Sequence, residues 1–127
     1  MVGEADVVGV DISGRHEESG SYLMVGAAVA ARVGSNRIDR IDGIGFQTSH
    51  GEPTLENALT VIRDALGDLP EPPQGPVVAE RGEFYGEPET NVSLGVDAEF
   101  KYVESIAERK TVDIAHHAAY AARNLLL

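Results

Sequence analysis

The sequence has no cysteine and no tryptophan, and its aromatic residues are limited to four tyrosines and three phenylalanines. Without cysteine, a disulfide scaffold, a thiol nucleophile and a cysteine-ligated zinc or iron–sulfur site are excluded. Long hydrophobic runs are also missing: the longest, residues 22–31, stops at ten residues, about half of what a membrane-spanning helix needs. The first residues are acidic and lack the basic start of a secretory signal. We therefore expect a cytoplasmic protein that does not enter a membrane.

Positive charge is scarce. Ten basic residues face 21 acidic ones, the net charge is -11, and Lys101 and Lys110 are the only lysines. A field of that sign repels nucleic acid at moderate salt, because phosphate contacts dominate non-specific affinity. The acid-rich, lysine-poor composition also resembles that of proteins from halophilic archaea, in which molar salt reduces the Debye length to about 3 Å. We favour this second interpretation, under which the charge argues only weakly against a nucleic-acid partner.

The length of 127 residues predicts a single domain, residues 1–127, that is large enough to bury a hydrophobic core. The β-branched run at residues 7–12 predicts a buried strand. Residues 22–33 predict a second strand, although their alanines leave a helix as an alternative. A turn signal at residues 34–36 precedes a third strand at residues 37–48. Short loops between these strands predict an antiparallel meander.

Helices and strands alternate in the second half of the sequence. Apolar residues at helical spacing predict a helix from Thr54 to near Gly67, followed by a proline-rich connector. The later segments are a strand at 77–80, an irregular or short helical piece at 83–95, a strand at 96–104 with one long helix as the alternative, and a terminal helix at 111–125. This order predicts an α/β fold: a mixed sheet of about five strands, the first three antiparallel, flanked by helices.

Three carboxylates stand at the ends of predicted elements. Asp11 closes the first strand, Glu80 closes the fourth, and Asp113 opens the terminal helix. A charged residue at the end of a buried strand is costly unless it is paired or bound to a metal. If the first and fourth strands are neighbours, Asp11 and Glu80 emerge side by side, and carboxylates that share a site favour Mg²⁺ or Mn²⁺. The alternative is that all three are ordinary boundary acids.

The order of the elements and three motifs carry a family resemblance. The motifs are Val-Gly-Val-Asp-Ile-Ser-Gly at residues 8–14, Val-Val-Ala-Glu at 77–80 and Asp-Ile-Ala-His-His-Ala at 113–118. Together they resemble the ribonuclease H-like superfamily, and most closely its RuvC-type Holliday-junction resolvase branch, over nearly the whole chain. With the acidic composition, we expect a small family from halophilic archaea.

The resemblance implies a ribonuclease H-like fold and a two-metal active site. Asp11 would bridge two Mg²⁺ or Mn²⁺ ions, Glu80 would hold one of them, and Asp113 with His116 would complete the other. Because neighbouring helix residues differ by about 100° around the axis, we expect His116 to be the ligand and His117 to be more exposed. The spacing of about thirty residues between Glu80 and Asp113 is shorter than in the resolvases, which implies reduced substrate-gripping helices.

Basic and aromatic side chains near the acids suggest contacts with a substrate. Arg15, His16 and Arg81 lie just past the predicted acids, where they would bind substrate phosphates; solvated surface charge is the alternative for each. Tyr85 and Tyr102 have the rings needed to stack on bases, but with only seven aromatic residues in the sequence we expect both to lie in the core.

Three hypotheses for function follow. The first is a metal-dependent nuclease that hydrolyses phosphodiester bonds of DNA or RNA with two divalent ions. The second is a non-catalytic ribonuclease H-like module that binds a partner or a nucleic-acid structure, because a fold does not fix a function. The third is a homo-oligomeric structural protein, suggested by the apolar tail at residues 125–127. The separated acids favour the first hypothesis, and the missing basic surface favours the other two.

Overall fold

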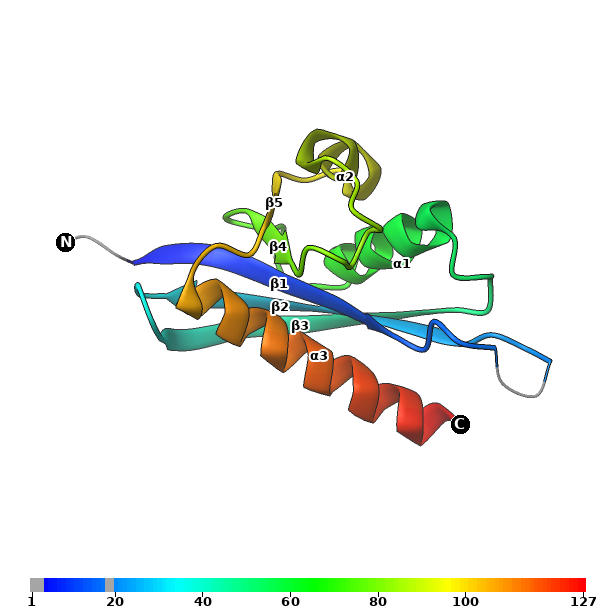
Figure 1. Ribbon diagram of the computed structural model, residues 1–127. Coiled ribbons are helices and arrows are strands. Elements are labelled where there is room, and N and C mark those ends of the chain that lie inside the picture. The colour runs from blue at the N-terminus through cyan, green and yellow to red at the C-terminus, as the bar shows by residue number, and fades with distance from the viewer. Residues whose placement is uncertain (1–3, 18–19) are drawn as a thin grey trace.

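Five strands form one mixed sheet with helices on both of its faces (Figure 1). The computed structural model describes residues 4–17 and 20–127. The strands are β1 (Ala5–Ser13), β2 (Met24–Val33), β3 (Ile38–Ser49), β4 (Val77–Ala79) and β5 (Phe100–Tyr102), and the helices are α1 (Leu55–Gly67), α2 (Glu89–Val96) and α3 (Ile106–Leu126). The sheet order is β3-β2-β1-β4-β5, antiparallel from β3 to β1 and parallel from β1 to β5. The predicted α/β fold, with its three antiparallel strands first, is confirmed.

The alanine-rich segment β2 is a strand, so the helical alternative for this part of the chain is wrong. Ala28 faces the main core on one side of the sheet. Ala27, its neighbour, packs against Ala115 and Ala119 of α3 on the other side. Both faces of the central strands are therefore covered, and small side chains allow a helix to approach the sheet closely.

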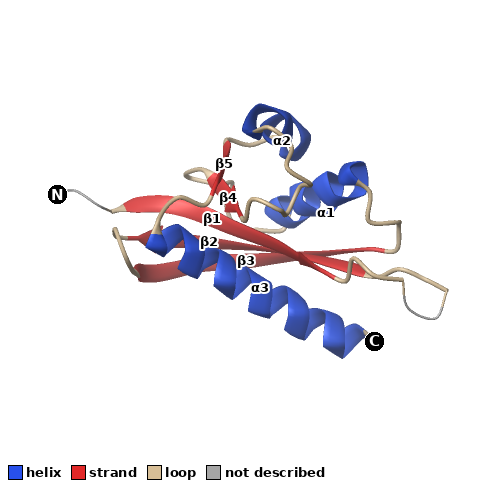
Figure 2. Ribbon diagram, viewed as in Figure 1, coloured by secondary structure: helices blue, strands red, loops and turns tan. Residues whose placement is uncertain are grey.

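Helix α3 runs along one face of the sheet, and α1 and α2 lie on the opposite side (Figure 2). Where α3 crosses β1, Gly9 lies against Thr111: a β-carbon on Gly9 would be 2.7 Å from the carbonyl carbon of Thr111. Only glycine allows this approach, because real β-carbons do not come so near to another backbone. Within the described ranges, none of the helices combines the length and the apolar character needed to cross a membrane.

The terminal helix starts at Ile106, five residues before the predicted boundary at 111. Its first turn carries a capping box, in which the Ser105 hydroxyl accepts a hydrogen bond from the Glu108 amide and the Glu108 carboxylate accepts one from the Ser105 amide. Lys101 of β5 adds an ion pair with Glu108 at 3.0 Å. The first turn is polar, so the spacing of apolar residues alone did not predict this helix start. The Ser-x-x-Glu sequence is, however, a recognised start signal.

The segment between β4 and α3 contains a short helix and a short strand rather than one long helix. Helix α2 ends at Val96, and the next residue, Asp97, caps it in the left-handed conformation with φ of 57°. Strand β5 then covers Phe100–Tyr102, inside the predicted range 96–104. The Phe100 ring packs edge-on against Phe84 at 5.7 Å and against Tyr102 at 5.1 Å. Aromatic packing therefore fixes this part of the chain to the core.

Strand β3 forms an open edge of the sheet. Its face on the α3 side leaves three large apolar side chains exposed, namely Ile41, Ile44 and Phe46. Two register irregularities interrupt its pairing with β2. The backbone amide of Phe46 donates a hydrogen bond to the Asp68 carboxylate at the end of α1, with a distance of 2.9 Å. A side chain therefore serves as the partner of an edge amide.

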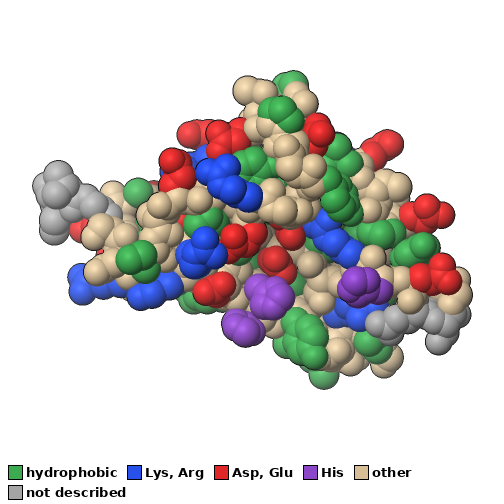
Figure 3. Space-filling model, in the orientation of Figure 1, with side chains coloured by type: hydrophobic (Ala, Val, Ile, Leu, Met, Phe, Trp, Pro, Cys, Tyr) green, Lys and Arg blue, Asp and Glu red, His purple; other side chains and the backbone are tan. Residues whose placement is uncertain are grey.

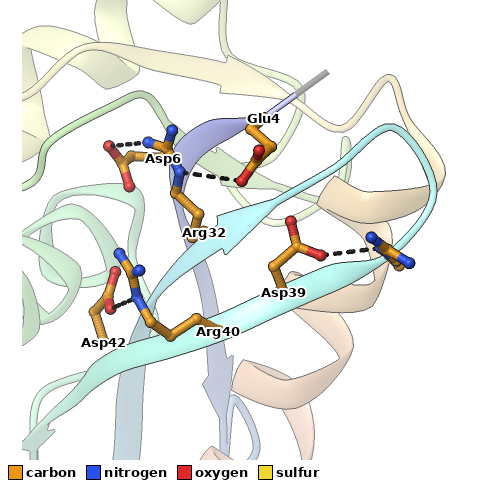
Figure 4. Close-up of polar contacts among 7 residues, drawn as sticks. Glu4, Asp6, Arg32, Asp39, Arg40 and Asp42 are labelled. Carbon is orange, nitrogen blue, oxygen red and sulfur yellow. Dashed lines mark hydrogen bonds and ion pairs between the residues drawn. The ribbon is translucent and has the colours of Figure 1, made fainter. Parts of the chain in front are cut away.

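Ion pairs gather where β1 begins and where β2 and β3 meet at their turn (Figure 4). Arg32 contacts Glu4 and Asp6, and Arg40 contacts Asp42. Arg32 and Arg40 are direct partners across β2 and β3, where like charges repel, so the neighbouring acids offset that repulsion. A cavity of about 400 Å³ lies beside these pairs and is lined by none of the predicted site residues.

Candidate active site

Asp11 lies near the carboxyl end of β1, two residues before the strand ends at Ser13, and Glu80 directly follows the neighbouring parallel strand β4. The register pairs Val8 with Val77 and Gly9 with Val78, so each acid follows the last paired position by two residues. Both acids face α3, because Asp11 contacts His116 and Glu80 contacts Arg109 of that helix. The structure thus brings together two of the three carboxylates that the sequence placed at this edge of the sheet.

Asp11 is a buried carboxylate, with only 8% of the residue exposed. Its Oδ2 lies 3.1 Å from Nδ1 of His116. Burial raises the pKa of the Asp11 carboxyl above its ordinary value, and the negative charge of Glu80 adds to this effect, whereas His116 and Arg15 act in the opposite direction. Ionising Asp11 therefore costs more free energy than in water, and a nearby cation lowers this cost.

Glu83 is a fourth acid at this edge, and the sequence analysis missed it. It lies in the turn after β4, and its Oε1 accepts a hydrogen bond from the backbone amide of Ile12 at 2.6 Å. Burial first, and then the charge of Asp11, raise the pKa of Glu83 to about 7. The sequence offers one signal for it: Glu83 comes three residues after Glu80. A tight turn between the two brings Glu83 back to the edge of the sheet where Glu80 lies.

Arg15 holds Glu83 in place. Its Nη2 donates to the Glu83 carbonyl oxygen at 2.6 Å and lies 3.3 Å from Oε2 of the same residue. The guanidinium also lies 5.2 Å from the centre of the Tyr85 ring. Tyr85 is half exposed and adopts a left-handed backbone conformation with φ of 57°. Arg15 is thus a partly buried structural contact as well as a candidate for phosphate binding.

The other predicted substrate contacts lie on the surface. His16 and Arg81 are exposed. The Arg81 guanidinium lies 5.8 Å from the centre of the Tyr102 ring. Tyr102 itself is buried and its hydroxyl donates to the Glu87 carbonyl. It is therefore a core residue, as expected from the sequence. Tyr85 is half exposed, so the expectation that it lies in the core is wrong.

The Glu80 carboxylate forms an ion pair with an arginine of the same chain. Nη1 of Arg109, near the start of α3, lies 2.6 Å from Oε1 of Glu80, and the two side chains are 59% and 40% exposed. It is the third contact between an acid and a basic side chain at this edge, after Asp11 with His116 and Glu83 with Arg15. Arg109 was not a candidate from the sequence, because the start of its helix was placed too late.

Asp113 and the two histidines lie on the helix that covers this edge. Asp113 and His117 are exposed, and His116 is exposed on the side away from Asp11. The two histidine rings pack edge-on with their centres 5.4 Å apart. On this face of the molecule, acidic side chains gather beside the histidines (Figure 3). Within residues 4–17 and 20–127, no ion pair or hydrogen bond joins the Asp113 carboxylate to another side chain.

Residues 8–127 match the family model described as "Uncharacterized protein conserved in archaea (DUF2209)". The chain belongs to this archaeal family. It is also 26% identical over 119 residues to an uncharacterized protein of Methanocaldococcus jannaschii, an alignment that covers 93% of this chain and 94% of the relative.

Among solved structures, this member of the archaeal family is similar to the ribonuclease H2 from Pyrococcus horikoshii OT3. The TM-score is 0.67 at 12% sequence identity, and the match covers 94% of this chain and 72% of the other. At such low identity the likeness shows the fold alone. The fold is therefore ribonuclease H-like, as the resemblance in the sequence implied.

The donor types at this edge suit a hard divalent cation. Carboxylate oxygens are the ligands that Mg²⁺ and Mn²⁺ prefer, and imidazole is an acceptable additional ligand for Mn²⁺. Among the residues that the structure describes, no three acidic or histidine side chains are grouped closely enough to hold a metal ion together. The contacts give a reason: Glu80 is engaged by Arg109 and Glu83 by Arg15. The chemistry of the site fits a metal, and two of its acids are occupied by arginines.

Proposed function

We propose that this protein is a metal-dependent nuclease that hydrolyses phosphodiester bonds of DNA or RNA. The observation that carries the proposal is the buried Asp11 carboxylate beside Glu80 at the ends of β1 and β4. His116 reaches Asp11 from α3. The similarity in fold to a protein named ribonuclease H2 supports the proposal. Its finer part, placement in the RuvC-type branch, depends on the motifs at residues 8–14, 77–80 and 113–118.

Asp11 and Glu80 would hold Mg²⁺ or Mn²⁺, with Asp113 and His116 completing a second position. When bound, two divalent ions supply an activated water and neutralise the charge that develops on the leaving oxygen. Burial disfavours the charged form of Asp11, so a bound cation would restore the ionised state that coordination requires. In such a mechanism the side chains mainly position the ions and the substrate and supply negative charge.

Arg15, His16 and Arg81 would contact the phosphates that flank the scissile bond. His16 and Arg81 are exposed, so their side chains are free to meet a backbone phosphate. Arg15 is held by Glu83 and would act mainly by keeping the loop after β1 in position. An exposed Tyr85 ring beside Arg15 offers a stacking surface for a base.

The test is cleavage of single-stranded DNA, single-stranded RNA, duplexes and RNA–DNA hybrids in the presence of Mn²⁺. We expect the wild type to cleave at least one of these, chelation of the metal to stop it, and Asp11→Asn to abolish it. Asp64→Asn is the control, because Asp64 is an exposed acid on α1, across the sheet from the site. Wild-type protein that leaves every substrate intact, or Asp11→Asn with undiminished activity, contradicts the proposal.

A non-catalytic binding module is the second candidate, and the ion pairs of the site favour it. Asp11, Glu80 and Glu83 each contact a histidine or an arginine of the same chain, which is the arrangement expected of a charge cluster that needs no metal. Under this alternative, the protein would bind one of the same oligonucleotides without cleaving it, and Mn²⁺ would not change its melting temperature.

A further inference from the structure

The three contacts between acids and basic side chains in the site differ in how far they are shielded from water. Glu83 and Arg15 have side chains only 12% and 19% exposed. The Asp11 side chain is similarly buried, at 11%, whereas its partner His116 is 59% exposed. Arg109 and Glu80 are 59% and 40% exposed. Exposed ion pairs contribute little to stability because water screens them. The contact between Arg109 and Glu80 is therefore the one most easily exchanged.

Glu80 is also the acid whose release would change the site most. The parallel register of β1 and β4 places it beside Asp11 at the same edge of the sheet. Glu83 cannot take its place without giving up the backbone amide of Ile12. A divalent ion shared by Asp11 and Glu80 would therefore have to displace the Arg109 guanidinium from Glu80.

The backbone around Arg109 is fixed, which leaves its side chain as the moving part. The capping box of Ser105 and Glu108 ties down the first turn of α3, and Lys101 adds its ion pair to Glu108. A long arginine side chain can leave Glu80 by rotation of its own bonds. Exchange of Arg109 for a metal ion then requires no rearrangement of the sheet or of the helix.

We propose that Arg109 is an internal cation that occupies Glu80 and competes with a divalent ion for it. This inference depends on the metal site of the proposed function. Binding of the ion displaces Arg109 from Glu80, so Arg109 sets how tightly the site binds metal. The freed guanidinium then lies at the rim of the site, where a substrate phosphate would be its next partner.

The test is titration of the full-length protein with Mn²⁺ by calorimetry. Arg109→Gln removes the competing charge, and we expect Mn²⁺ to bind at least about 5-fold more tightly, the lower end of usual coupling between sites. Arg37→Gln is the matched control. Arg37 forms an exposed ion pair with Asp39 at 2.9 Å near the turn between β2 and β3, and its substitution changes the net charge by the same amount as Arg109→Gln. Glu80→Gln in the Arg109→Gln background should remove the gain.

Tighter binding is a result that structural damage would not produce. Melting of Arg109→Gln in the presence of a chelator should match the wild type, because the lost ion pair is exposed. If Arg109→Gln binds Mn²⁺ as Arg37→Gln does, or less tightly than the wild type, Arg109 does not compete and this inference is wrong, while wild-type binding still supports the metal site. Absence of Mn²⁺ binding in all variants overturns both the inference and the proposed metal site.

Discussion

Gly9 of β1 and Thr111 of α3 are in backbone contact: a β-carbon at Gly9 would lie 2.7 Å from the carbonyl carbon of Thr111. This contact sets how closely α3 approaches the sheet. Asp11 lies two residues further along β1, and His116 lies five residues further along α3, where the two side chains meet at 3.1 Å. The geometry of the candidate site therefore depends on a glycine that takes no part in its chemistry.

Gly9→Ala should destabilise the protein by about 1–3 kcal/mol, because the added methyl group meets a helix backbone that cannot move aside. Chemical denaturation followed by circular dichroism measures the change. Gly67→Ala is the control, since a β-carbon there meets nothing within 4 Å and the residue ends α1. Its stability should be unchanged or slightly raised. Equal losses in both variants would contradict the close contact.

His116→Ala should weaken Mn²⁺ binding by about 10-fold, because the imidazole contacts Asp11, the acid proposed to hold the metal. His117→Ala should have a much smaller effect, since His117 is exposed and contacts the neighbouring histidine ring rather than an acid. Calorimetric titration of both variants checks this. The two histidines are adjacent and equal in charge, so each is the control for the other. Equal weakening would mean that charge rather than position matters.

Glu108 predicts a pH dependence of stability. Burial raises the pKa of its carboxyl, but hydrogen bonds from the Glu104 amide and from Lys101 outweigh burial, and the net pKa is lowered. A carboxyl whose pKa falls on folding stabilises the protein above its unfolded pKa, near 4.5, and this contribution is lost as the pH falls through the folded value. Glu108→Gln should cost about 1 kcal/mol at neutral pH. The difference from the wild type should vanish in acid, as urea titrations across pH would show.

Salt should stabilise the fold. With a net charge of -11, repulsion among surface acids opposes folding in dilute buffer, and screening by salt reduces it. The melting temperature should therefore rise from dilute buffer to molar KCl, as the proposed halophilic origin requires. The same titration near the isoelectric point of about 4.6 is the control, because little net charge is left to screen there. A flat curve at neutral pH would remove the halophilic interpretation.

The sequence predicted the strands and two acids of the site because hydrophobic runs and their ends are local signals. Asp11 lies near the end of the run at residues 7–12, and Glu80 directly follows Val77–Ala79, although β1 itself continues to Ser13. Glu83 could not be predicted, because its position depends on a turn and on a hydrogen bond to Ile12, 71 residues away in sequence. Arg109 was missed for a different reason: a capping box, rather than an apolar stripe, begins its helix.

The hydrogen bond from the Phe46 amide to Asp68 has a consequence for how this protein behaves at high concentration. An open strand edge with exposed Ile44 and Phe46 is a template on which another chain can add a strand and begin an aggregate. An incoming strand would have to displace a charged carboxylate from the Phe46 amide and would also meet the irregular pairing of β3. The end of α1 thus acts as a gatekeeper against sheet growth, and Asp68→Ala would leave that edge open to polymerisation.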